Sequence, residues 1–150
     1  MAGKSDTLEY QLLTLIFNGV GISSLATSAG TTGLWLGLHT ADPGDACSTA
    51  NESGYAQYTR VKTDRSTGAS TGWAVTSGTS NTDATAAPVT NVDFPQNTST
   101  STGTFTHASV WMSSNASSSG CLYFGTVSPN INFSQNVTPR MTTGSSITED

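Results

Sequence analysis

The sequence predicts a mainly β domain, an antiparallel sandwich or barrel, with one amphipathic α-helix near its N-terminus. The first reason is composition: only 10% of the 150 residues are Asp, Glu, Lys or Arg, against about 25% in an average soluble protein. Ser, Thr, Asn and Gly replace them, and Thr in particular fits the pleat of a strand better than a helix. The second reason is a series of short apolar runs separated by turn residues. One domain over residues 1–150 accommodates them.

The single helix is expected over residues 7–18. Asp6 and Glu9 form a capping-box pattern, in which the Asp6 carboxylate accepts free N–H groups of the first turn and Glu9 reaches back. Gly19 follows where a left-handed cap is wanted. The apolar residues that share one face are Leu8, Leu12, Leu15 and Ile16. This face either covers the open side of the β domain or docks against a partner subunit, and we favour the first role.

The β domain is expected over residues 34–150. Its first strand covers residues 34–40, where leucines alternate with other residues at period two. A turn with a proline and a glycine follows and ends this strand. Residues 54–61 predict a second strand, with a bulge because its aromatic residues are not spaced strictly by two. Trp35 and Trp73 are candidates for the core first and for interface anchors second.

The second half of the chain predicts a run of further strands. Residues 104–112 and 122–127 are strong candidates, and residues 113–120 between them are only Ser, Asn, Ala and Gly, so we expect an antiparallel hairpin or a neighbouring antiparallel pair. The other expected strands are short: residues 71–75, 90–94, 131–133, 137–141 and 145–148. Strands that follow one another at this spacing favour a sandwich or barrel over a βαβ fold.

The charge and hydropathy patterns argue against two classes of partner. A formal net charge of −5, with only five Lys and Arg residues spread along the chain, opposes binding to nucleic acid, whose phosphates attract clustered basic residues. No apolar stretch approaches the roughly 20 residues that cross a bilayer. We therefore expect neither a nucleic-acid partner nor a membrane partner.

Several short motifs follow one another in a characteristic order. After the amphipathic segment come residues 38–43 (LHTADP), 54–56 (GYA) with Arg60, 94–95 (FP), 105–107 (FTH), 122–125 (LYFG) and 146–150 (SITED). In this order they resemble a widespread family of small bacteriophage virion proteins that are often labelled tail fibre protein. The resemblance implies a structural role in the virion and leaves the position on the particle open. Ser/Thr-rich inserts over residues 63–87 and 96–103 depart from the pattern of the family.

Within that role we expect a head decoration or cement protein on the exterior of the capsid. It would bind the major capsid protein and other copies of itself as a homotrimer, because closed symmetry covers the edges of its sheets. A compact domain of this size also lacks the length and repeats of an elongated fibre. The alternative is a tail fibre, tail-tip or adaptor protein that binds tail proteins and contacts the host surface. Either protein would be made in the cytoplasm of the host bacterium.

No group of residues predicts catalysis, a metal or another cofactor. A set of His39, His107, Asp42 and a serine lacks a nucleophile-elbow motif, and a zinc site built from the histidines and the two cysteines lacks the paired spacing of known sites. We therefore expect a protein that is not an enzyme. Cys47 and Cys121 are expected as free thiols because the bacterial cytosol is reducing, with a disulfide formed after lysis as the alternative.

Overall fold

The computed structural model describes residues 3–5, 8, 11–12, 17–18, 33–65, 70–76, 84–115 and 120–149. Within these residues the chain is mainly β and its paired strands are all antiparallel, as the sequence predicted. The helix expected over residues 7–18 falls largely outside the described residues, so it stays a prediction. No helix in the described part of the chain is long and apolar enough to cross a membrane.

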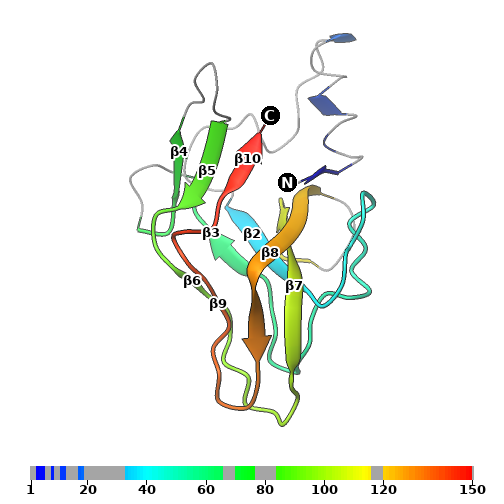
Figure 1. Ribbon diagram of the computed structural model, residues 1–150. Coiled ribbons are helices and arrows are strands. Elements are labelled where there is room, and N and C mark those ends of the chain that lie inside the picture. The colour runs from blue at the N-terminus through cyan, green and yellow to red at the C-terminus, as the bar shows by residue number, and fades with distance from the viewer. Residues whose placement is uncertain are drawn as a thin grey trace.

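The strands form two larger sheets and a separate pair (Figure 1). The five-stranded sheet has the order β1 (Gly3–Lys4), β8 (Cys121–Phe133), β7 (Gly103–Trp111), β2 (Leu34–His39) and β3 (Val61–Thr63). The three-stranded sheet has the order β10 (Ile147–Glu149), β5 (Ala84–Pro88) and β4 (Trp73–Thr76). The separate pair is β6 (Val92–Asp93) with β9 (Arg140–Met141).

The hairpin of β7 and β8 is the centre of the larger sheet and confirms the strongest strand prediction. Beyond that prediction, β8 joins residues 122–127 and 131–133 into one strand that includes Pro129. The register explains how the strand tolerates proline: Phe105 pairs with Ile131 and His107 with Thr126, so the single residue 106 of β7 lies opposite the four residues 127–130 of β8. Pro129 lies in this bulge, where a missing N–H group breaks no ladder hydrogen bond.

The two faces of the five-stranded sheet carry different side chains because neighbouring residues of a strand point to opposite sides. Leu36 and Leu38 of β2 belong to the main core, which also contains Trp73 of β4. The three-stranded sheet therefore packs against this face. On the opposite face, Trp111 and the two cysteines form a second, smaller cluster that the loop between β2 and β3 covers.

The strand predicted over residues 54–61 is wrong, since only Val61 joins a strand. Residues 54–57 form bends and a turn, in which the Tyr58 N–H group donates to the Tyr55 carbonyl at 3.1 Å. Tyr55 and Tyr58 both pack into the core from this turn. Their spacing of three residues therefore places the two side chains on one side of a turn and does not reflect a bulge in a strand.

The sequence also missed two strands. β1 has only two residues, and β5 lies in the Ser/Thr-rich insert, where three alanines and a proline carry little strand preference. Pairing on both sides, with β4 and β10, holds β5 in place. The weaker predictions over residues 71–75, 90–94, 137–141 and 145–148 each contain or overlap an observed short strand.

Candidate functional site

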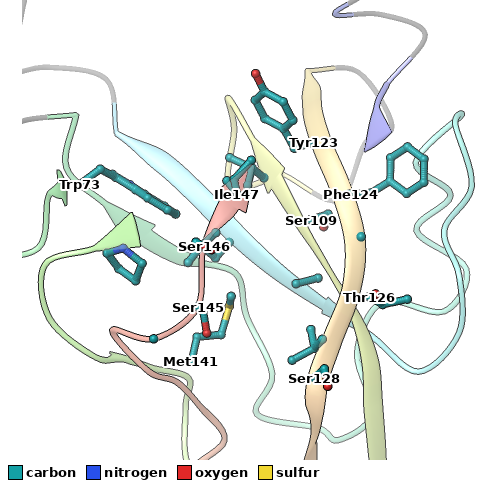
Figure 2. A pocket seen from close by; sticks show the side chains of 17 residues that line it. Trp73, Ser109, Tyr123, Phe124, Thr126, Ser128, Met141, Ser145, Ser146 and Ile147 are labelled. Atoms are coloured by element: carbon teal, nitrogen blue, oxygen red, sulfur yellow. The ribbon is translucent and has the colours of Figure 1, made fainter. Parts of the chain in front are cut away.

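An open cleft lies between the two larger sheets and is the candidate binding surface (Figure 2). Its volume is about 360 Å³, within the range of small-ligand sites. One wall is β8, with Tyr123 and Val127, and the other is the C-terminal segment, with Met141 and Ile147. Leu36 and Val110, from β2 and β7, also line it. The cleft is therefore a place where the sandwich is left partly open.

The chemistry of the cleft is neutral. None of its lining residues is charged: they are Leu36, Trp73, Pro88, Ala108, Ser109, Val110, Tyr123, Phe124, Gly125, Thr126, Val127, Ser128, Met141, Gly144, Ser145, Ser146 and Ile147. Thr126, Ser128 and Ser146 are exposed residues of this lining. Such a lining can make apolar contacts and neutral hydrogen bonds, and it lacks a charge that would select an ionic ligand.

Two strand edges border the cleft. In the part of the chain that the structure describes, β1 pairs with β8 only at Tyr123 and Phe124, so no strand lies on that side of β8 from Gly125 onward. β10 likewise pairs only with β5. Edge strands carry unpaired N–H and C=O groups that another chain can use. The cleft and its borders can therefore accept a neighbouring polypeptide.

Those of the selected anchor residues that the structure describes lie in the core or pack against it. Leu8 is buried and Leu12 packs against the same main core, so these two support the covering role of the N-terminal segment. Leu15 and Ile16 lie outside the described residues. Trp73 is 8% exposed and lines the cleft, and its indole N–H donates to Thr63 Oγ1 at 2.9 Å. Trp35 is half-buried against the smaller cluster.

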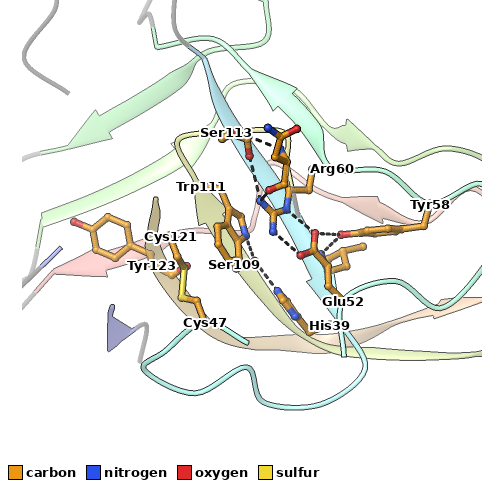
Figure 3. A network of polar contacts seen from close by, with 12 residues as sticks. His39, Cys47, Glu52, Tyr58, Arg60, Ser109, Trp111, Ser113, Cys121 and Tyr123 are labelled. Carbon is orange, nitrogen blue, oxygen red and sulfur yellow. Dashed lines mark hydrogen bonds and ion pairs between the residues drawn. A yellow bond between two sulfur atoms is a disulfide. The ribbon is translucent and has the colours of Figure 1, made fainter. Parts of the chain in front are cut away.

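A buried ion pair lies on the opposite face of the larger sheet (Figure 3). Arg60 Nε and Nη2 each donate to one oxygen of the Glu52 carboxylate at 2.6 Å, which is the bidentate geometry of a strong pair. Arg60 Nη1 donates to the carbonyl oxygens of Ser113 and Asn115. The guanidinium also lies 3.6 Å from the centre of the Trp111 ring. This arrangement joins the β2–β3 loop to the β7–β8 hairpin.

His39 and Ser109 form the only histidine–serine contact among the described hydrogen bonds, with Nε2 and Oγ 2.6 Å apart. Both residues are almost fully buried, and Ser109 Oγ also accepts the Trp111 indole N–H at 2.6 Å. His39 Nδ1 has no hydrogen-bond partner among the described residues, so no carboxylate orients the ring. Burial lowers the pKa of His39 from 6.5 to about 4. A buried imidazole that is neutral near pH 7 and has no orienting carboxylate fits a structural network better than a catalytic pair.

The other residues of the hypothetical catalytic set have structural roles as well. Asp42 Oδ1 accepts the Gly44 N–H at 2.9 Å and so stabilises the turn after β2. His107 Nδ1 lies 2.9 Å from the hydroxyl of its neighbour Thr106. Among the described residues no three His, Cys, Asp or Glu side chains are grouped so that they could hold a metal ion.

The expectation of two free thiols is wrong for this structure, because Cys47 and Cys121 form a disulfide. Both are fully buried beside Trp111. They are 74 residues apart in the chain, and sequence reasoning had no way to bring the loop after β2 to the start of β8. The disulfide also removes both sulfurs from the hypothetical zinc site.

Apart from Trp73, sequence reasoning missed the residues of the cleft, and it also missed the Arg60–Glu52 pair. No feature of the sequence marked the cleft, because its Ser, Gly and Val residues are of the same types as the rest of the chain. The ion pair had a weak signal: charged residues are only 10% of this chain, and two of them lie eight residues apart beside aromatic residues. Charge so scarce is a reason to ask whether each charged residue has a buried partner.

A family model described as podophage GP4 fiber I protein gp80 matches residues 3–148 of the chain. No curated protein matches the chain. The match covers almost the whole sequence, and the cleft and, apart from Glu149, both sheets lie within the matched residues.

Proposed function

The chain belongs to the family of the podophage GP4 fiber I protein gp80, and from this premise we propose that it is a non-enzymatic fibre component on the tail side of the phage particle. Membership of a fibre family makes it a virion structural protein. It also favours the tail alternative over the head decoration protein that the sequence first suggested, and it gives no support to the major capsid protein as partner. The family match is the observation that carries this proposal.

We propose further that the protein works by binding other copies of itself and neighbouring tail proteins. Two features of the surface support this. The cleft is neutral, and it is bordered by edges of β8 and β10 with which no described strand pairs. In addition, β4 is the edge of the three-stranded sheet, and its Val75 is 69% exposed. An exposed apolar side chain on an open edge strand suits pairing with another subunit. A homotrimer would cover such edges by closed symmetry.

The position on the particle is tested by imaging intact virions with a gold-labelled antibody raised against the recombinant chain. The expected result is label confined to the tail. Label spread over the head would overturn the tail position and restore the decoration reading. A quantitative mass-spectrometric count of copies per particle gives an independent check, because head decoration requires hundreds of copies whereas a tail fibre requires far fewer.

Self-association is tested on the recombinant chain by light scattering after size exclusion. We expect a mass three times that of the 15.4 kDa chain. Val75→Lys should reduce this mass, because lysine on an edge strand opposes pairing. Val137→Lys is the matched control, since Val137 is also an exposed valine at 39% and lies in a loop outside the strands. A monomeric wild-type chain, or equal effects of the two substitutions, would contradict pairing through β4.

A further inference from the structure

The disulfide fastens a long loop over one face of the larger sheet (Figure 3). Cys47 lies in the loop between β2 and β3, and Cys121 is the first residue of β8. Their relative exposures are 0% and 1%. This loop also carries Glu52, whose carboxylate holds Arg60 against Trp111. The state of the two sulfurs therefore decides how firmly the loop is held on the sheet.

Contacts other than the disulfide already place the loop. The Thr40 N–H group donates to the Asn51 carbonyl at 2.9 Å, and Ser53 N–H donates to the Leu38 carbonyl at 3.4 Å. The ion pair of Glu52 with Arg60 adds a side-chain anchor. Because these contacts involve neither sulfur, a chain with two thiols can fold with Cys47 beside Cys121. The disulfide then adds a covalent bond to an arrangement that already exists.

The turn around Cys47 aims its side chain at β8. Cys47 has a φ of 48°, in the left-handed region that non-glycine residues rarely adopt. Two hydrogen bonds hold this turn: Cys47 N–H donates to the Gly44 carbonyl at 2.8 Å, and Ser48 N–H to the Pro43 carbonyl at 2.9 Å. The unfavourable backbone conformation of Cys47 is thus maintained by the turn. Such strain is often kept where it serves a function, and here it sets the position of the sulfur.

The compartments that a phage protein passes through differ in redox state. It is made in a bacterial cytoplasm, where thiols are kept reduced, and it then acts in a particle outside the cell, where disulfides persist. The chain has only these two cysteines, so no alternative pairing within one chain competes. We propose that Cys47 and Cys121 form a redox lock, which is open as two thiols during synthesis and assembly and closes after the particle leaves the cell.

The closing step needs an oxidant, and dissolved dioxygen supplies it. The two thiols lose two electrons and two protons as the S–S bond forms, and dioxygen takes them up to give hydrogen peroxide. Because both sulfurs are buried, the oxidant reaches them only when the loop opens. The same burial then protects the finished disulfide from reductants. The inference rests on the proposed function only in that the chain belongs to a released particle, and it does not depend on the position of the chain on that particle.

The first experiment traps the redox state in both compartments. Infected cells and purified virions are each quenched with acid, unfolded in denaturant that contains N-ethylmaleimide so that the buried sulfurs are accessible, and digested without reductant for mass spectrometry. We expect both cysteines to carry the label in cells, and a linked Cys47–Cys121 peptide pair in virions. A linked pair already present in the cytoplasm would overturn the lock, and so would two labelled cysteines in the virion. Gold labelling reports position separately, so the two proposals fail by different observations.

The second experiment measures what the lock does. Hydrogen exchange of the recombinant chain is compared before and after reduction, with Cys47→Ser and Cys121→Ser as variants that should not respond to reductant. We expect faster exchange over residues 41–53 after reduction, with β7 unchanged, and a Tm lower by roughly 8–16 °C. If the loop exchanged at the same rate in both states, the disulfide would not restrict its opening, and the proposed lock would be overturned.

Discussion

Breaking the buried pair of Arg60 and Glu52 should cost much of the stability of the fold. The two side chains are only 2% and 6% exposed, so neither charge can be solvated when its partner is removed. Arg60→Met keeps the stem of the side chain and removes the guanidinium. The Glu52 carboxylate then keeps, of its described partners, the Tyr58 hydroxyl at 3.2 Å. Breaking one side of a buried pair costs about 3–5 kcal/mol.

The double variant tests the reason for that cost. Arg60→Met with Glu52→Gln removes both charges, so no buried charge is left without a partner. We expect the double variant to be more stable than Arg60→Met alone, and within about 2 kcal/mol of the wild-type chain, because replacing a whole buried pair is often close to neutral. The coupling energy of the cycle then measures the interaction of the two side chains.

The assay is urea unfolding of the oxidised chain, followed by tryptophan fluorescence, which is suited to a site where Trp111 lies under the guanidinium. Arg140→Met is the matched control: Arg140 also forms a bidentate pair, with Asp93, but the two side chains are 50% and 47% exposed. The unfolding midpoint of this control should stay close to that of the wild type. The reasoning would be refuted if the stability losses of the single Arg60 and Glu52 variants simply summed to that of the double variant. It would also be refuted if Arg60→Met lost as little stability as Arg140→Met.

Three further outcomes follow from the structure. Burial lowers the pKa of His39 from 6.5 to about 4, so the unfolded chain takes up a proton that the folded chain resists. The contribution of neutral His39 to the free energy of unfolding should therefore be fully present above pH 6.5. Between pH 6.5 and pH 4 it should fall by at most about 1.4 kcal/mol per pH unit. Urea unfolding at several pH values measures this dependence, which should be absent in His39→Gln and present in His107→Gln. Under reducing conditions Cys47→Gly should be more stable than Cys47→Ser by about 1 kcal/mol, because glycine relieves the left-handed backbone; equal Tm values would contradict this. Asn97 is fully buried, and its side chain bonds to Ser99 and Ser101, so Asn97→Ala should lower stability by about 1–3 kcal/mol in urea unfolding.

The sequence alone determined the class of fold and its strongest strands. Alternation at period two is a local property of the chain, so β2 and the β7–β8 hairpin could be predicted from it. The scarcity of charge argued against a nucleic-acid partner. The order of short motifs indicated a virion protein, and the family match supports that reading. It did not indicate the position on the particle, because no motif distinguishes a head surface from a tail surface.

Only the tertiary structure decided which distant residues meet. The disulfide joins residues 74 positions apart, Arg60 reaches carbonyl groups of the β7–β8 hairpin, and the cleft takes its walls from β8 and from the C-terminal segment. Each of these contacts depends on strand order and on the path of the loops. Local patterns fix which way a side chain points from its own strand, but not which strand will lie beside it. For that reason the individual strands were predictable, and the order of the strands, the disulfide, the ion pair and the cleft were not.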